Sequence, residues 1–428
     1  MAASGAEVSA GPGLLVPGPP GPPGRPPRQS RRDRRRAGGS GPARRKLRSR
    51  PTFRVIALLL LAFLAWTGWS VEHALTVPGG GTVSERLAEW ARDHYLGPVV
   101  TFAEWVMYTP PKVGGEPSFS LAMPTTGATA GTGGHKHHHK KKHQFTGPGF
   151  GRPAKLASPA GKPLKGEGHW RILAKAHNVP AIYGTYLRPD KVHTSYVAGI
   201  ASMNPHLLKF ELHPGSEDPG AGNWGKAQPD IPPGQRRGLL ATFNGGFKVS
   251  SSQGGFFLNG TTRGVLTRGI ASMVYYKNGD LKIGVWGQHG LRMTKKVAGV
   301  RQNLRPLVQN GRVPASVDQN VQTNWGATLG GGYFVWRSGI GVTADGRIIF
   351  VYGPALDVRT LASLLQRAGC VTAMELDINP DWMSYMSYQP HHHNRANPVP
   401  VNLLPTQIQP ATRYYAVANR DFTAVYAR

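Results

Sequence analysis

The sequence predicts an α+β fold: a strand-rich, mixed-sheet domain with few helices, preceded by a disordered basic tail, one transmembrane helix and a flexible linker. From His169 onward, short apolar runs alternate with turns rich in Gly, Asn and Asp, which is typical of strands joined by tight connections. Near the N-terminus, an uncharged apolar run follows a stretch rich in Gly, Pro and Arg that cannot bury a core. A second low-complexity stretch, rich in Gly, Lys and His, precedes the strand-rich region.

The N-terminal apolar run predicts a membrane anchor. Residues 55–71 carry no charge, and 17 residues are near the lower limit for crossing a hydrocarbon layer of about 30 Å. Trp66 and Trp69 suit a membrane interface at its C-terminal end. Because residues 1–54 are rich in Arg, we expect this tail to stay in the cytoplasm and the C-terminal domain to be extracytoplasmic. A cleaved signal peptide is the alternative, although no clear cleavage pattern follows the run.

The charge of the chain bears on its partners. The formal net charge is +29, and much of it lies in the N-terminal tail and in the run from His135 to His143. A basic tail beside a membrane span is a topology signal that also contacts anionic membrane lipid. No nucleic-acid-reading motif accompanies the charge, so nucleic acid is not an expected partner. The single cysteine, Cys370, excludes an intramolecular disulfide and is expected to be buried.

Two segments are expected between the membrane span and the domain. Residues 72–108 form a juxtamembrane helical segment, in which Val83–Val106 has apolar side chains at helical spacing. Residues 109–168 are rich in Pro, Gly, Lys and His and predict a linker. The histidines of this linker could hold a transition metal loosely, but the adjacent lysines would repel a cation. A solvated and partly pH-sensitive linker is therefore the favoured interpretation.

Two hairpins are predicted within the domain, which is expected to span residues 169–428. The clearer one joins Ser272–Lys277 to Leu281–Trp286, because the Asn-Gly pair between them readily adopts the positive φ angles of a tight turn. The second joins Ile340–Thr343 to Ile348–Tyr352 through an Asp-Gly turn.

One convincing helix is predicted in the domain, at Asp357–Ala368. Asp357 is placed to cap its start, three leucines form an apolar stripe, and Gly369 ends it. Further strands are predicted at Ile182–Leu187, Tyr196–Met203, Leu207–Leu212 and Val371–Leu376.

Carboxylates gather where the strand Val371–Leu376 ends. Because side chains alternate along a strand, Glu375 and Asp377 are expected to point to the same face. Asp381 follows in a loop, with Trp382 beside it. Acids next to an aromatic ring at the end of a core strand suit a site for a sugar or a phosphate ester. The alternative is that each acid only caps a turn.

Four segments, in this order, resemble the phosphodiester glycosidase family. They are residues 239–247 (LLATFNGGF), 305–311 (RPLVQNG), 336–346 (WRSGIGVTADG), and the helix and strand that end in Leu376-Asp377. The order and spacing of these segments carry the resemblance, which covers residues 180–390. In the family a glycine run and a serine follow the Leu-Asp pair, whereas this chain has INPDW at 378–382. Because proline lacks an N–H donor, a phosphate cradle here would be built differently, the substrate would differ, or catalysis would be lost.

The resemblance implies hydrolysis of a glycosyl phosphodiester. Hydrolysis at an anomeric carbon commonly uses carboxyl groups, and Asp377 is the first candidate, followed by Glu375 and Asp381. A phosphate leaving group needs less proton donation than a sugar alcohol, but its oxygens need cationic or amide donors.

Donors for the phosphate or the sugar are found in two of the similar segments. Arg337 offers a planar fork of N–H groups for a phosphate, and its alternative role is a structural salt bridge on a hairpin. Asn244 could hold a sugar hydroxyl or the phosphate, with Gly245 and Gly246 letting the backbone turn tightly. The alternative for these three residues is an ordinary turn. Trp382 could stack on a sugar ring.

No cofactor is predicted, and a divalent metal is left open. The run 391–393 contains three histidines after the site strand, but neighbours in a strand alternate sides and cannot all face one ion. The predicted function is a membrane-anchored, extracytoplasmic hydrolase that cleaves a glycosyl phosphodiester of a cell-envelope glycan or phosphopolymer. The alternative is a non-catalytic domain that binds such a polymer on the same scaffold, and the altered segment 378–382 keeps it open.

Overall fold

The computed structural model describes residues 51–76, 83–123, 150–319, 324–326, 333–391, 394 and 396–428. The predictions for the tail up to residue 50, for the histidine run 135–143 and for residues 392–393 lie outside these ranges. The chain divides into two units, Met1–Leu64 and Ala65–Arg428.

An apolar helix, α1 (Pro51–Thr76), contains the predicted membrane anchor. Its segment Thr52–Thr76 is long and apolar enough to cross a membrane. The helix is longer than the predicted 17-residue run because residues on both sides continue it. At a rise of 1.5 Å per residue, 25 residues span about 37 Å, which exceeds the thickness of a hydrocarbon layer.

The single helix predicted at Val83–Val106 is wrong, because the structure has two helices there. They are α2 (Val83–Asp93) and α3 (Gly97–Met107). The chain leaves the helical conformation at Tyr95, whose φ is 64°. Pro98 lies in the first turn of α3. A proline is accommodated in a first turn, where no N–H is needed, but would interrupt a continuous helix.

The domain is built from three sheets, and every pairing between their strands is antiparallel. The strand-rich α+β fold is confirmed, although the pairing is antiparallel where mixed sheets were expected. The first sheet is 7-stranded, with the order β1 (Arg171–Ala176), β2 (Val179–Leu187), β3 (Ala198–Met203), β13 (Ile348–Leu356), β12 (Val335–Thr343), β14 (Cys370–Glu375) and β11 (Pro306–Val308).

The other two sheets are 5-stranded. The second has the order β7 (Thr261–Arg263), β6 (Phe256–Leu258), β10 (Val297–Gln302), β8 (Ala271–Tyr276) and β9 (Leu281–Val285). The third has the order β16 (Val399–Asn402), β15 (Tyr385–Gln389), β5 (Leu239–Asn244), β17 (Phe422–Ala427) and β4 (Leu208–His213).

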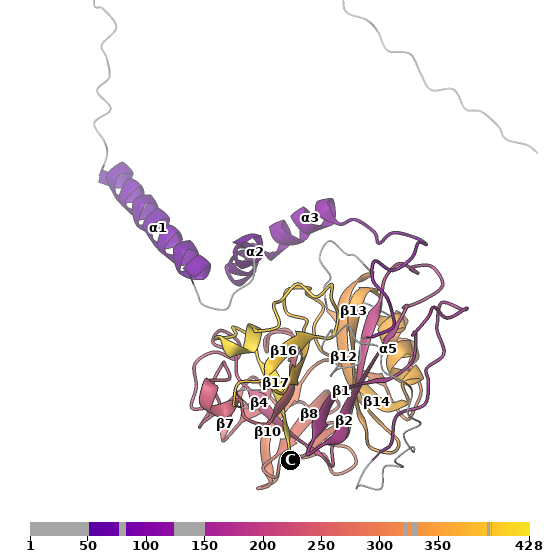
Figure 1. The fold of residues 1–428 in the computed structure, drawn as a ribbon. Coiled ribbons are helices and arrows are strands. Elements are labelled where there is room, and N and C mark those ends of the chain that lie inside the picture. The colour runs from indigo at the N-terminus through magenta and orange to yellow at the C-terminus, as the bar shows by residue number, and fades with distance from the viewer. Residues whose placement is uncertain are drawn as a thin grey trace, which may run out of the picture. The chain divides into compact units, whose positions relative to one another are not determined.

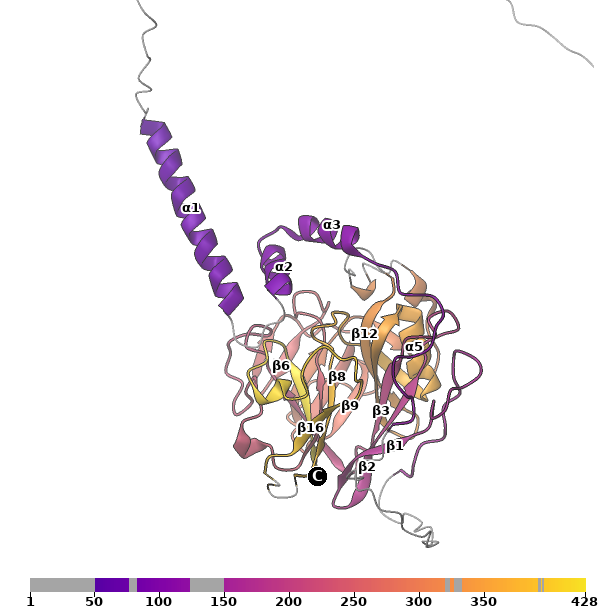
Figure 2. The same ribbon diagram turned by 45° about the horizontal axis from the view of Figure 1, so that its top comes forward.

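Local sequence signals explain two turns and one helix of the domain. The hairpins β8–β9 and β12–β13 form as predicted, with Gly279 and Gly346 at φ values of 87° and 94°. The helix α5 (Val358–Arg367) begins where Asp357 accepts a hydrogen bond from the Thr360 N–H at 2.6 Å. Figures 1 and 2 show the first sheet between α5 on one side and β8 on the other.

Aromatic side chains hold the sheets together. Phe350 of β13 lies 5.2 Å from Phe243 of β5 and 5.3 Å from Tyr385 of β15, measured between ring centroids. The Tyr275 hydroxyl of β8 is 2.6 Å from Thr423 Oγ1 of β17. The three sheets therefore share one core, and loops at the ends of their strands can meet in one site.

Burial confirms the expectation for Cys370 and extends the packed region beyond residue 169. The thiol of Cys370 is buried, which raises its pKa, so it is not a candidate nucleophile. Leu121 and Met123 are buried in the core, and buried Glu167 accepts a hydrogen bond from Arg188 Nε at 3.1 Å. Both flanks of the segment expected as a linker thus pack against the domain.

Candidate active site

A single hydroxyl joins the strand ends that carry the predicted site. Ser338 Oγ of β12 accepts a hydrogen bond from Asn244 Nδ2 at 3.0 Å and one from the Asp377 N–H at 3.1 Å. Asn244 Oδ1 in turn accepts from the Ser384 N–H at 3.1 Å. Asn244 and Asp377 are therefore neighbours in the structure. The Asn244 amide is buried and used within the protein, so in this structure it aligns strands.

Asp377 both caps a turn and faces a cation. Its Oδ1 accepts hydrogen bonds from the N–H groups of Ile378 at 2.7 Å and Asn379 at 3.0 Å. Its Oδ2 lies 3.6 Å from Arg420 Nη2. Burial raises the pKa of Asp377 to about 6, although Arg420, the two amides and Arg301 act in the opposite direction. A carboxylate that titrates near neutrality beside a guanidinium is suited to acid–base or nucleophilic work.

Glu375 and Arg337 form a fully buried ion pair. Arg337 Nη1 donates to Glu375 Oε1 at 2.7 Å, and Arg337 Nε donates to the Leu356 carbonyl at 2.9 Å. Glu375 Oε2 has no hydrogen-bond partner. Burial raises the pKa of Glu375 to about 7, while Arg337 lowers it and Asp377 raises it. Because both side chains are buried, the structure favours the alternative role of Arg337 in a structural salt bridge. Contact of Arg337 with a phosphate stays a prediction.

Asp381 and Trp382 lie in the segment that departs from the family pattern. The Asp381 carbonyl accepts hydrogen bonds from Gln409 Nε2 at 2.8 Å and Arg413 Nη1 at 2.6 Å. Trp382 is buried, and the guanidinium groups of Arg413 and Arg420 lie 5.3 and 5.4 Å from its ring. In this structure the indole positions Arg420 by a cation–π contact, and stacking on a sugar stays a prediction.

The two glycines after Asn244 are required by close packing. The structure places neither Gly245 nor Gly246 at a positive φ, which differs from the expected glycine-dependent turn. A Cβ on Gly245 would lie 2.0 Å from Asp421 Oδ2, and one on Gly246 would lie 2.8 Å from Asn303 Oδ1. The absence of a side chain lets two polar residues, one directly after β10 and one directly before β17, reach this backbone.

Sequence reasoning missed these polar neighbours. Asn303 Nδ2 donates to the carbonyls of Glu375 and Leu376, each at 2.9 Å, and Asn303 Oδ1 accepts from the Phe247 N–H at 3.1 Å. Its amide therefore ties the glycine segment to the end of β14. The signal in the sequence was a run of three polar residues, Arg301-Gln302-Asn303, at the end of an apolar strand.

A second buried ion pair underlies the glycine segment. Arg301 donates to both carboxylate oxygens of Asp421, at 2.9 and 3.0 Å. Burial raises the pKa of Asp421, and Arg301 partly offsets that effect. The polar run Asn419-Arg420-Asp421 immediately before β17 was the corresponding sequence signal.

Two cations share a carboxylate of helix α2, and one of them, the buried Arg420, also lies beside Asp377. Arg420 Nη1 lies 3.3 Å from Glu89 Oε1 of α2, and Lys248 Nζ lies 3.5 Å from the same oxygen. Lys248 Nζ is also 3.2 Å from Asp93 Oδ2. A cavity of about 490 Å³ borders Lys248 and Glu89. Arg420 and Lys248 thus already hold carboxylate oxygens, and phosphate oxygens would meet the same donors.

Metal ligands are not clustered in the part of the chain that the structure describes. Within those ranges, no group of three or more His, Cys, Asp or Glu side chains is arranged to hold an ion.

Comparison with known proteins bears on the resemblance noted in the sequence. Residues 237–378 match the family model described as phosphodiester glycosidase. No curated protein matches the chain. Among solved structures, the catalytic domain of zebrafish N-acetylglucosamine-1-phosphodiester alpha-N-acetylglucosaminidase is 12% identical, with 61% of this chain and 88% of that chain covered and a TM-score of 0.38. A hypothetical protein from Synechocystis is 12% identical, with coverages of 59% and 63% and a TM-score of 0.33.

The family match covers the strands that carry the site. It includes β5, β12 and β14 in full, and it ends one residue after Asp377. The resemblance of this chain to the phosphodiester glycosidase family is therefore confirmed over residues 237–378.

Proposed function

We propose that this chain is a membrane-anchored hydrolase that cleaves a glycosyl phosphodiester outside the cytoplasm, in a cell-envelope glycan or phosphopolymer. The family match supports the reaction class. One observation supports placing this reaction at Asp377: its Oδ2 lies 3.6 Å from Nη2 of Arg420. It sets a carboxylate of raised pKa beside a cation that can receive a phosphate oxygen.

In the proposed chemistry, a carboxylate acts at the anomeric carbon and cations stabilise the leaving phosphate. Ionised Asp377 attacks the anomeric carbon or activates water, and the carbon–oxygen bond to the phosphate breaks. The phosphate leaves as a stable anion, so protonation by a second carboxyl group is less important than for a sugar alcohol. Arg420 and Lys248 stabilise the negative charge that develops on the phosphate oxygens. Glu375 and Arg337 support this arrangement from within the sheet.

Turnover by the full-length protein tests this proposal. The protein in detergent would be incubated with a panel of sugar-1-phosphodiesters, and the released sugar would be measured. We expect release to fall by at least a hundredfold in Asp377→Asn and in Arg420→Gln, because each removes a group that acts in the transition state. Arg359→Gln, which removes an exposed arginine paired with Asp318, is the matched control.

The alternative of a polymer-binding domain has one observation in its favour. Trp382 and its neighbours replace the glycine run of the family, and the guanidinium groups of two arginines lie 5.3 and 5.4 Å from its ring. This alternative predicts retention of an envelope polymer that Asp377→Asn leaves unchanged, with no sugar released from any diester. Release of sugar that depends on Asp377 would eliminate it.

A further inference from the structure

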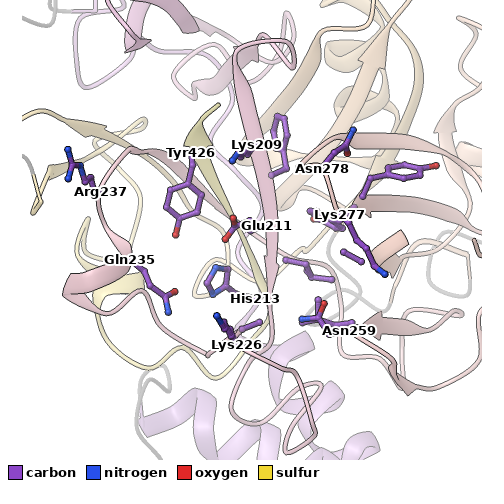
Figure 3. Close-up of a pocket in the computed structure, with 18 of the residues that line it drawn as sticks. Lys209, Glu211, His213, Lys226, Gln235, Arg237, Asn259, Lys277, Asn278 and Tyr426 are labelled. Atoms are coloured by element: carbon purple, nitrogen blue, oxygen red, sulfur yellow. The ribbon is translucent and has the colours of Figure 1, made fainter. Parts of the chain in front are cut away.

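A second cavity, of about 800 Å³, lies apart from the candidate active site (Figure 3). Strand β4, the turn between β8 and β9 and the loop before β5 supply most of its wall. None of the predicted site residues lines it. Its volume falls in the range of small-molecule sites and is several times that of a single phosphate group.

Positive charge in this cavity is largely uncompensated. Lys209, Lys226, Arg237 and Lys277 line it, and Glu211 is its one acidic side chain among the described residues. Within the described ranges, none of these four cations forms an ion pair with a carboxylate. Burial raises the pKa of Glu211, with Lys209 opposing that effect. A ligand with negative charge would neutralise these cations.

A histidine in the same cavity provides a hydrogen-bond acceptor. His213 Nδ1 donates to the Gln228 carbonyl at 2.9 Å, and burial lowers the pKa of His213 to about 4. The ring is therefore neutral at pH 7, and Nε2 is left as an acceptor. Alternation along β4 places Lys209, Glu211 and His213 on one face, as Figure 3 shows.

Tyrosine and amide side chains complete the wall. Tyr426 is paired in register with Lys209, so its ring borders the charged face of β4. Gln235, Asn259 and Asn278 contribute amides from three separate loops or turns (Figure 3). The Asn278 amide is bonded to Asp280 and Asn259 Nδ2 donates to the Trp224 carbonyl, so Gln235 and Asn259 Oδ1 are the groups offered to a ligand. Aromatic faces and amide groups suit ring carbons and hydroxyl groups of a sugar, whereas a bare anion would use neither.

We propose that this cavity binds a phosphorylated saccharide: its lysines and Arg237 take the phosphate, and His213 Nε2 with the amides takes sugar hydroxyls. The inference rests on the proposed function, because the phosphorylated saccharide in this cavity would belong to the same polymer that is cleaved at Asp377. Binding here would hold the polymer on the enzyme while a different linkage is cleaved at Asp377.

Binding measurements on the full-length protein carrying Asp377→Asn, in detergent, test the proposal without hydrolysis of the polymer. The probes are phosphomannan, unphosphorylated mannan, oligogalacturonate and inorganic polyphosphate, each titrated by calorimetry. We expect phosphomannan to bind, and Lys226→Ala with Lys277→Ala to weaken its binding at least tenfold. The matched control, Lys191→Ala with Lys295→Ala, removes the same charge from exposed positions outside the cavity and should leave binding unchanged.

Each other outcome overturns a stated part of the inference. Equal loss in both double variants would show that only the overall charge acts. Oligogalacturonate binding as tightly as phosphomannan would overturn the choice of phosphate, and polyphosphate binding as tightly would overturn the role of the sugar. Absence of turnover in the wild-type chain, with cavity-dependent binding intact, would contradict the proposed function alone. Turnover without cavity-dependent binding would contradict this inference alone.

Discussion

At the scale of single residues, Arg420 favours the ionised form of Asp377. The guanidinium lowers the pKa of Asp377, against the larger effect of burial. Activity that needs the ionised carboxylate should rise with pH through about 6 in the wild type. In Arg420→Gln the pKa of Asp377 should rise further, so the acid limb of residual kcat should move to higher pH.

The measurement is kcat between pH 4 and 9. Arg413→Gln is the control, since Arg413 also contacts Trp382, whereas Arg420 is the cation that lies 3.6 Å from the Asp377 carboxylate. An acid limb at the same pH in Arg420→Gln and in the wild type would contradict the role of Asp377 as the titrating group.

Arg337 is expected to act on stability more than on substrate affinity. Its truncation to alanine would leave Glu375 buried without a partner, which typically costs about 3–5 kcal/mol of unfolding free energy. Urea unfolding followed by fluorescence would measure the loss. If Arg337→Ala unfolds like the wild type and only raises KM, the prediction of a phosphate clamp is supported instead.

Some residues of the candidate site were predictable and others were not, for a physical reason. Alternation along a strand and a polar residue after an apolar run are local signals, and they made Asp377 and Asn244 candidates. The partners Arg301 and Asp421 are 120 positions apart, and their contact depends on how two sheets meet. No local pattern encodes that meeting.

At the scale of elements, the glycine segment after β5 depends on a missing side chain. Gly245→Ala would place a methyl group on Asp421 and displace the carboxylate from Arg301, so we expect destabilisation of about 1–3 kcal/mol. Gly151→Ala is the control, because a Cβ there meets no atom and the φ of Gly151 is not positive. Thermal unfolding of the two variants would compare them. A Gly245→Ala protein as stable as the control would show that Asp421 relocates freely.

Helix α2 places an acidic side chain on the proposed phosphate donors. Glu89 competes with a substrate anion for Arg420 and Lys248, so Glu89→Gln should lower KM several-fold by removing that charge. Asp93→Asn removes the same charge from the same helix but leaves the contact with Arg420, and it should have a smaller effect. Steady-state kinetics with a sugar-1-phosphodiester would decide, and an unchanged KM in Glu89→Gln would show that α2 does not compete.

Elements were more predictable than their pairing. Asn-Gly and Asp-Gly turns located two hairpins, and an Asp cap with a terminal glycine located α5. The strand order of the sheets joins segments from distant parts of the chain. The prediction of one helix at Val83–Val106 was wrong because it followed the apolar spacing and gave too little weight to Pro98.

At the scale of the whole molecule, orientation in the membrane decides which substrates can be reached. The basic tail predicts a cytoplasmic N-terminus, so a reporter enzyme fused after residue 428 should be active only when it works outside the cytoplasm. Fusions of alkaline phosphatase, which needs export, and of a cytoplasmic reporter form the matched pair. Activity of the cytoplasmic reporter alone would remove the envelope polymer as a substrate.

The side chain of Asn303 has a consequence for how this fold can change over time. One amide reaches from the second sheet to the glycine segment of the third sheet and to the end of β14 in the first. Inserting or deleting a residue in any of the three segments would break the hydrogen bonds of that amide. Length variation among related sequences should therefore accumulate in other loops, while these three junctions keep a constant number of residues.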